Sequence, residues 1–172
     1  MGRDNPSAWL TDNADVLPRG GRALDVASGR GRHALWLAAA GFDVTAVDRN
    51  ADAMSRLRAV AAGMQLAVDA RVVDLETDPP PSLGTAQFDV VVGFHYLHRP
   101  LMPIIKDAVK PGGLIVYETF TTHQAGRGHP KNPAFLLRDG ELLALMEPFT
   151  ILRSREGDID GRCIASVVAR RG

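Results

Sequence analysis

The stretch that decides the fold is Leu24-Asp25-Val26-Ala27-Ser28-Gly29-Arg30-Gly31-Arg32-His33-Ala34. A short apolar run is followed by two closely spaced glycines and then by residues that begin a helix. Gly29 and Gly31 let the backbone turn sharply and approach a ligand closely, because neither carries a side chain. The helix beyond them offers free backbone N–H groups to a polar ligand. The stretch therefore predicts a strand, a ligand-binding glycine loop and a helix.

Outward from this stretch, short β-branched runs alternate with longer helical stretches. This alternation is typical of an α/β fold with a mostly parallel sheet. The expected strands cover residues 23–27, 42–47, 70–73, 88–93, 114–119, 150–155 and 162–169. The expected helices cover residues 32–40, 51–62, 101–109 and 139–146.

The connections are predicted from their glycines and prolines. Residues 77–84 contain three consecutive prolines and form a surface loop. Residues 110–113 make a tight turn into the fifth strand, and residues 156–161 make a hairpin turn between the last two strands. Residues 121–137 are too polar for the core and too long for a tight connection, so we expect a lid or binding loop there.

A carboxylate at the end of the second strand indicates the class of ligand. Asp48 follows Gly29 by nineteen residues, and a carboxylate in that place can accept hydrogen bonds from both hydroxyls of a ribose. Residues 29–34 also satisfy the dinucleotide pattern G-x-G-x-x-G/A, which leaves a nicotinamide cofactor open. Asp25, however, would repel a pyrophosphate, whereas it suits the sulfonium and amino groups of S-adenosylmethionine. Charge therefore favours S-adenosylmethionine.

Five motifs in order resemble those of class I S-adenosylmethionine-dependent methyltransferases, over about residues 20–120. They are Asp25-x-x-x-Gly29-x-Gly31, Val47-Asp48, Val73-Asp74-Leu75, Phe88-Asp89-Val90-Val91-Val92 and Lys110-Pro111-Gly112-Gly113-Leu114. Within that family, three segments of the sequence are similar to those of small-molecule methyltransferases of the tellurite-resistance type. The segments concerned are Gly29-Arg30-Gly31-Arg32-His33, Tyr117-Glu118-Thr119-Phe120 and Asn132-Pro133-x-Phe135-Leu136-Leu137.

The resemblance implies a single doubly wound Rossmann-like domain over residues 1–172. Its mostly parallel seven-stranded sheet would end in an antiparallel C-terminal hairpin, with residues 1–20 as an N-terminal cap and residues 121–137 as an acceptor-site loop. It also implies methyl transfer from S-adenosylmethionine to a small-molecule acceptor. The residues expected to bind the cofactor are Asp25, Ala27, Gly29, Gly31, Asp48, Arg49, Asp74, Leu75 and Phe94.

The residues after the fourth strand are the candidates for catalysis. In doubly wound sheets, ligands meet the carboxyl ends of the strands, so this segment should border the transferred methyl group. His95, Tyr96 and His98 could orient or deprotonate the acceptor. Two alternatives stay open at this point, a non-catalytic S-adenosylmethionine-binding protein and an NAD-dependent oxidoreductase.

Composition excludes several classes of partner. Lys and Arg total 20, as do Asp and Glu, so a nucleic-acid binder relying on bulk positive charge is not expected. No apolar stretch approaches the ~20 residues of a membrane span, and we expect a cytoplasmic protein without a membrane partner. Cys163 is the only cysteine, and His123 with His129 lacks a third metal ligand, so no metal is expected. Arg127, His129 and Lys131 favour an anionic acceptor; the oligomeric state is not predicted.

Overall fold

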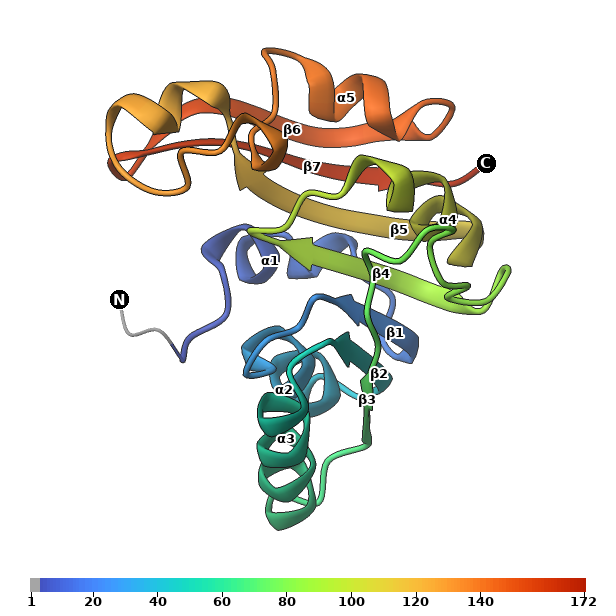
Figure 1. Cartoon of the computed structure of the whole chain (residues 1–172). Coiled ribbons are helices and arrows are strands. Elements are labelled where there is room, and N and C mark those ends of the chain that lie inside the picture. Colours follow the sequence, from blue (N-terminus) through green and yellow to red (C-terminus); the bar gives the residue numbers. More distant parts are fainter. Residues whose placement is uncertain (1–3) are drawn as a thin grey trace.

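The computed structural model describes residues 4–172, and a seven-stranded sheet runs through the middle of this part of the chain (Figure 1). The sheet order is β3-β2-β1-β4-β5-β7-β6, and only β7 runs antiparallel to its neighbours. The predicted doubly wound fold with an antiparallel C-terminal hairpin is confirmed. The strands are β1 (Gly21–Val26), β2 (Phe42–Asp48), β3 (Val68–Val72), β4 (Phe88–Phe94), β5 (Val109–Phe120), β6 (Thr150–Ile159) and β7 (Arg162–Arg170).

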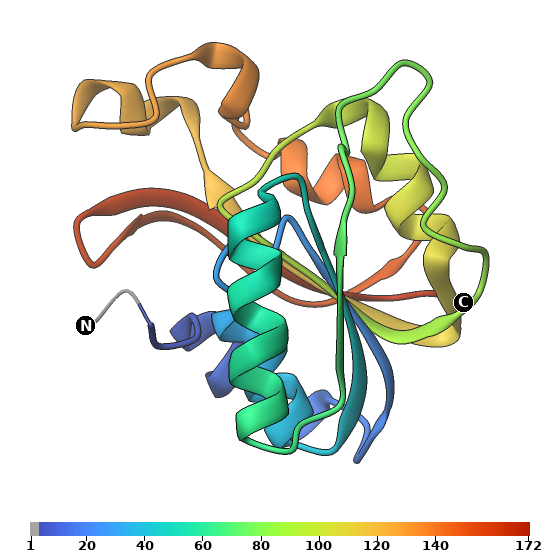
Figure 2. The ribbon, with the colours of Figure 1, turned by 60° about the horizontal axis from the view of Figure 1, so that its bottom comes forward.

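Helices cover both faces of the sheet (Figure 2). One face carries α1 (Ala8–Asp12), α2 (Arg32–Ala39) and α3 (Ala51–Gly63), and the other carries α4 (Met102–Ala108) and α5 (Glu141–Met146). Because both faces are buried, the central strands are apolar along their whole length instead of alternating. In β4, Val90 and Val92 pack toward α2 while Val91 packs toward α4.

Two turns differ from the expected ones. The β6–β7 hairpin turns at Asp160-Gly161 instead of over residues 156–161, and these two residues have φ values of 51° and 79°. Two successive positive φ values are the geometry of the tight type I′ turn, which Asp-Gly favours and which lets both strands continue. Residues 110–113 belong to β5, where the pairing register with β4 shifts after Phe88, so they form a bulge and not a turn.

The segment of residues 121–137 is a closed loop with two short 3-10 turns, Thr122–Gly126 and Pro133–Phe135. Its two ends meet, because the N–H of Thr122 donates to the Leu137 carbonyl and the N–H of Leu137 donates to the Phe120 carbonyl, both at 2.9 Å. The loop therefore leaves the end of β5 and returns to it.

The predicted N-terminal cap packs on one face of the sheet. Its first three residues lie outside the described part of the chain. Trp9 and Leu10 of α1 are buried with the apolar residues of α2 and α3, and the Trp9 indole N–H donates to the Val167 carbonyl at 3.2 Å. Residues 4–20 thus enlarge the hydrophobic core on the face of the sheet that α2 and α3 also cover, next to β5 and β7.

We expect Gly31→Ala to destabilise the protein. Gly31 has a φ of +80°, and a Cβ there would overlap the side chain of Leu57, which is buried in the core. A non-glycine residue in this region of φ costs about 1–3 kcal/mol, and we expect a loss of that size in the free energy of unfolding, measured with urea. Gly126→Ala is the control, because open space surrounds that glycine. Equal losses in the two variants would contradict this reading of the loop.

Candidate functional site

A cavity of about 300 Å³ lies at the carboxyl ends of the parallel strands, the place where ligands bind in doubly wound sheets. Five strand ends and the loop of residues 121–137 form its wall. Of the residues predicted to bind the cofactor or act in catalysis, it brings together Ala27, Asp48, Arg49, Asp74, Leu75, His95 and Tyr96. Val73, Glu76, Leu97, Thr119, Phe120, Pro130 and Phe135 complete the lining.

Asp48 fastens the glycine loop to the end of β2. Its Oδ2 accepts the N–H of Gly29 at 2.9 Å, and its Oδ1 accepts the N–H of Asn50 at 2.8 Å. An ionised carboxylate can accept about four hydrogen bonds, so each oxygen keeps acceptor capacity for a ligand in the cavity. One side chain therefore shapes the loop and faces the ligand site.

Asp25 lies beneath the loop and does not line the cavity. It is buried, and its Oδ2 accepts the N–H of Ala34 in α2 at 3.0 Å. Burial raises the pKa of this carboxyl to about 7, although the Ala34 hydrogen bond and the charge of Arg32 work against that rise. Asp25 is thus held where a cation bound nearby would favour its ionised form.

Of the two histidines predicted to act in catalysis, His95 is the one that lines the cavity. Its ring stacks on Phe120, with the centroids 4.8 Å apart, and its backbone N–H donates to the Glu118 carbonyl at 2.8 Å. Loss of hydration among the surrounding residues lowers the pKa of His95, and the positive charge of Arg32 lowers it further. The imidazole is therefore neutral at pH 7 and able to accept a proton.

Tyr96 also lines the cavity, but its chemistry differs. Its hydroxyl is buried and has no hydrogen-bond partner among residues 4–172. Burial, together with the negative charges of Glu76 and Asp74, raises the pKa of the Tyr96 hydroxyl. A phenol with a raised pKa keeps its proton at pH 7, so it does not act as a base there but still has an O–H to donate to a ligand. His98, the third predicted catalytic residue, is outside the cavity lining.

Phe94 and the two loop glycines are also outside the lining. Phe94 stacks on His33 of α2 with the ring centroids 4.0 Å apart, because in a strand it shares one face with Val90 and Val92. The prediction that Phe94 binds the cofactor gains no support from this placement. Gly29 and Gly31 have positive φ values, so they shape the loop through their backbone conformation.

The residues that sequence reasoning missed come from two sources. Thr119 ends the predicted strand of residues 114–119, and Glu76 follows the predicted strand of residues 70–73 by three residues, so their positions could have singled them out. Pro130 and Phe135 belong to the loop of residues 121–137, and Phe135 is 46% exposed although it lines the cavity. The sequence predicts an acceptor-site loop over residues 121–137, and Phe135 lies in a segment that resembles the tellurite-resistance type, but only the folded loop decides which of its residues reach the cavity.

Two other residues considered in the sequence analysis, His123 and Cys163, lie outside the cavity lining. His123 contacts Asp139 at 2.9 Å, and across residues 4–172 no three His, Cys, Asp or Glu side chains are arranged to hold a metal ion. Cys163 is buried in β7. None of the helices formed by the described residues is long and apolar enough to cross a membrane.

Comparisons with known proteins show the family and the fold of this chain. A family model described as a methyltransferase domain matches residues 23–113. TehB from Haemophilus influenzae has a TM-score of 0.76 at 19% identity, covering 95% of this chain but only 61% of TehB. An S-adenosylmethionine-dependent methyltransferase from Mesorhizobium loti has a TM-score of 0.75 at 21% identity, covering 96% and 98% of the two chains. One from Aquifex aeolicus has a TM-score of 0.73 at 17% identity, covering 98% and 95%. A search among curated proteins found no match.

We expect Asp25→Asn to stabilise the protein at pH 8 and not at pH 3. The pKa of this carboxyl is raised in the folded state from 3.8 to about 7, so its stability contribution is lost as the pH rises through that window. An asparagine can still accept the Ala34 N–H but carries no charge to bury. We expect a gain of at least about 1 kcal/mol at pH 8, or about 2–4 °C in Tm.

Thermal unfolding at the two pH values measures this effect. Asp43→Asn, at an exposed position of β2, is the matched control and should change Tm little at either pH. A gain for Asp25→Asn that is the same at pH 3 and pH 8 would contradict the ionisation argument.

Proposed function

Because the chain belongs to the methyltransferase-domain family, we propose that it methylates a small-molecule acceptor at the carboxyl-edge cavity. It is an S-adenosylmethionine-dependent methyltransferase, and the two alternatives that the sequence left open, a non-catalytic binding protein and an NAD-dependent oxidoreductase, are set aside. The observation that carries the placement is Asp48, whose carboxylate is tied to the glycine loop and still faces the cavity.

The residues of the cavity fit the adenosine part of S-adenosylmethionine. Asp48 would accept hydrogen bonds from the ribose hydroxyls, and Asp74 from the adenine amino group, with Leu75 as an apolar wall. The unpartnered Tyr96 hydroxyl supports this fit, because a buried donor gains free energy from a ligand acceptor. We therefore assign Tyr96 to cofactor binding and not to proton transfer.

The remaining predicted cofactor residues act around this centre. Ala27 and Arg49 line the cavity beside Asp48, and Gly29 and Gly31 keep the loop close to the ligand. Asp25, beneath the loop, would favour the positively charged amino and sulfonium groups of the cofactor.

The protein's part in the reaction is alignment and proton transfer. When bound, S-adenosylmethionine supplies a methyl group on a positively charged sulfur. The chain would position the acceptor next to that methyl and exclude water, and such positioning can account for much of the rate. His95 is neutral at pH 7 and would take the proton of a hydroxyl or amine acceptor.

The loop of residues 121–137 supports an acceptor of limited size. Pro130 and Phe135 line the cavity together with Phe120, and the loop is closed at its base by hydrogen bonds. The resemblance of the sequence to small-molecule methyltransferases of the tellurite-resistance type also supports a small acceptor. The proposed reaction takes place in the cytoplasm, in keeping with a single free cysteine.

We expect Asp48→Ala to weaken binding of both S-adenosylmethionine and S-adenosylhomocysteine by at least about tenfold, equivalent to about 1.4 kcal/mol. Two ribose hydrogen bonds to a charged acceptor are lost, and the glycine loop loses its anchor. Isothermal titration calorimetry measures this, with NADH as a ligand that should not bind. Asp69→Ala is the control, because Asp69 is exposed on β3 and pairs with Arg71. Unchanged affinity in Asp48→Ala would remove the ribose assignment.

We expect His95→Gln to lower turnover by about 100-fold, the contribution typical of a general base, while the affinity for S-adenosylmethionine changes little. Release of S-adenosylhomocysteine in the presence of acceptors found by screening measures turnover. His98→Gln serves as the control, because His98 lies outside the cavity lining. If His95→Gln retains full turnover over the whole pH range, His95 is not the base.

A further inference from the structure

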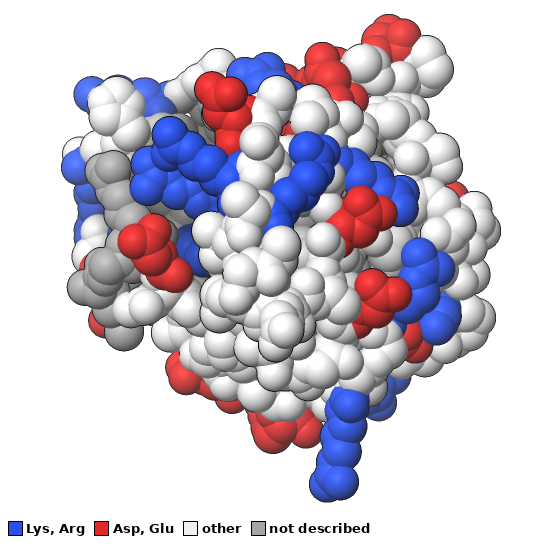
Figure 3. Space-filling view, turned by 90° about the horizontal axis from the view of Figure 1, so that it is seen from below, with Lys and Arg blue, Asp and Glu red and all other residues white. Residues whose placement is uncertain are grey.

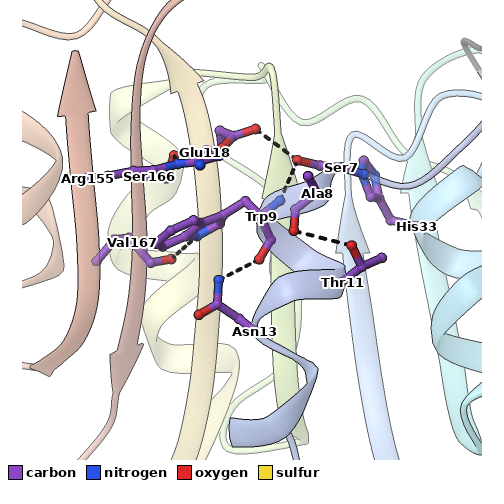
Figure 4. A network of polar contacts seen from close by, with 10 residues as sticks. All are labelled: Ser7, Ala8, Trp9, Thr11, Asn13, His33, Glu118, Arg155, Ser166 and Val167. Atoms are coloured by element: carbon purple, nitrogen blue, oxygen red, sulfur yellow. Dashed lines mark hydrogen bonds and ion pairs between the residues drawn. The ribbon is translucent and has the colours of Figure 1, made fainter. Parts of the chain in front are cut away.

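The N-terminal strap, residues Asn5–Ser7, is held against α2 and β5 by polar contacts (Figure 4). The Ser7 N–H donates to His33 Nε2 at 3.1 Å, and the Ser7 hydroxyl donates to Glu118 Oε1 at 2.9 Å. Burial lowers the pKa of His33 to about 3, so the ring is neutral and its nitrogen can accept. Arg32 donates from Nη1 to the Asn5 carbonyl at 3.0 Å. The strap therefore holds the Arg32 guanidinium at the start of α2.

The negative charge of Glu118 is already matched. Its Oε2 accepts the Ser166 hydroxyl at 2.6 Å and Arg155 Nη2 at 3.1 Å. The Arg155 guanidinium also lies 4.7 Å from the centroid of the Trp9 ring. Glu118 and Arg155 thus form an ion pair in which the carboxylate is buried and the guanidinium is partly exposed, so Arg155 is the direct partner of the Glu118 charge.

Arg162 lies at the same edge of the sheet. It is the first residue of β7, and the N–H of Thr121 donates to the carbonyl of the next residue, Cys163, at 2.9 Å, which sets this end of β7 beside the end of β5. By the two-residue alternation of a strand, Arg162 shares its face with Ser166, which bonds to Glu118. Arg162 and Arg32 therefore belong to the same side of the sheet.

These two arginines have no direct carboxylate partner among residues 4–172, although the charges of Asp25 and Glu118 favour the charged form of Arg32. Other arginines near the hairpin have carboxylate partners, Arg127 with Asp158 and Arg153 with Asp15. Within residues 4–172, neither Arg32 nor Arg162 forms an ion pair. Burial and then the charge of Arg162 lower the pKa of Arg32, and both arginines lower the pKa of His95.

The space-filling view shows where Lys and Arg side chains gather on one face of the molecule (Figure 3). Lys and Arg side chains gather at the left of the face, and β4 and β5 also end on the left in Figure 1. Two guanidinium groups that repel each other near a candidate base raise the free energy of the site, and an anion that binds to both of them would lower it.

We propose that the methyl acceptor is an anion, and that Arg32 and Arg162 bind its negative charge beside His95. The inference rests on the proposed function and adds the charge of the acceptor and two residues that select it. It also revises the sequence-based argument for an anionic acceptor, which rested on the loop of residues 121–137, because Arg127 of that loop is paired with Asp158. Guanidinium groups suit carboxylate and phosphate oxygens, to which they can make paired hydrogen bonds.

The carboxylate of the cofactor is the other anion that could reach these arginines. The test therefore titrates inorganic phosphate into protein saturated with S-adenosylhomocysteine, whose carboxylate is already in place, at constant ionic strength. The affinity for S-adenosylhomocysteine is measured separately for each variant. The variants are Arg32→Gln and Arg162→Gln, and Arg56→Gln on the exposed side of α3 is the control.

We expect phosphate to bind the loaded protein and Arg162→Gln to weaken that binding by about fivefold or more. Arg32→Gln should weaken it similarly, and Arg56→Gln should leave it unchanged. The affinity of Arg162→Gln for S-adenosylhomocysteine should stay within about twofold of the parent.

Three results would overturn the inference. Phosphate binding that is absent, or insensitive to Arg162→Gln, would show that the two arginines hold no second anion. Loss of S-adenosylhomocysteine affinity in both variants with phosphate binding intact would assign the arginines to the cofactor carboxylate, and the proposed function would stand. Failure of the parent protein to bind either S-adenosylmethionine or S-adenosylhomocysteine would instead remove the proposed function itself.

Discussion

The hydrogen bond from the Gly29 N–H to the Asp48 carboxylate ties the glycine loop after β1 to the end of β2, at the edge of the sheet where the cavity lies. It depends on parallel pairing of β1 and β2, which brings Val26 beside Val47 and so sets both strand ends at one edge. It also depends on glycine, since Gly29 and Gly31 both take positive φ values. The loop, the start of α2 and the carboxylate that faces the cavity are consequently one structural unit.

Two buried titratable groups beside this unit respond to pH in opposite ways. Burial raises the pKa of Asp25 to about 7 and lowers the pKa of His33 to about 3. The contribution of Asp25 to stability is lost as the pH rises from 3.8 toward 7, whereas that of His33 is lost as the pH falls from 6.5 toward 3. Both groups anchor parts of the site, Asp25 through the Ala34 N–H and His33 through the Ser7 N–H. At pH 7 the buried His33 ring is therefore neutral, whereas Asp25 is close to the midpoint of its titration.

The two sides of the site differ in what they offer a ligand. The side of Asp48, Asp74 and Glu76 is acidic and suits hydroxyl and amino groups. Arg32 and Arg162 lie outside the cavity lining, and their positive charges act on His95, which lines it. An enzyme that joins a cationic cofactor to an anionic acceptor would need this separation, because each ligand then meets charges of the opposite sign.

The sequence by itself determined the order of strands and helices, the glycine loop, and the strand-end residues Asp48, Asp74 and His95. Those features follow from local rules, because apolar periodicity, glycine spacing and strand ends all act over a few residues. Phe94 was predicted for the cofactor because it ends a strand, but the tertiary structure decided which face its ring takes, through stacking on His33. The same holds for Pro130 and Phe135, which reach the cavity on a folded loop, and for Arg162, which joins Arg32 across more than a hundred residues of chain. Such placements depend on sheet pairing and loop closure between distant segments, and no local pattern encodes them.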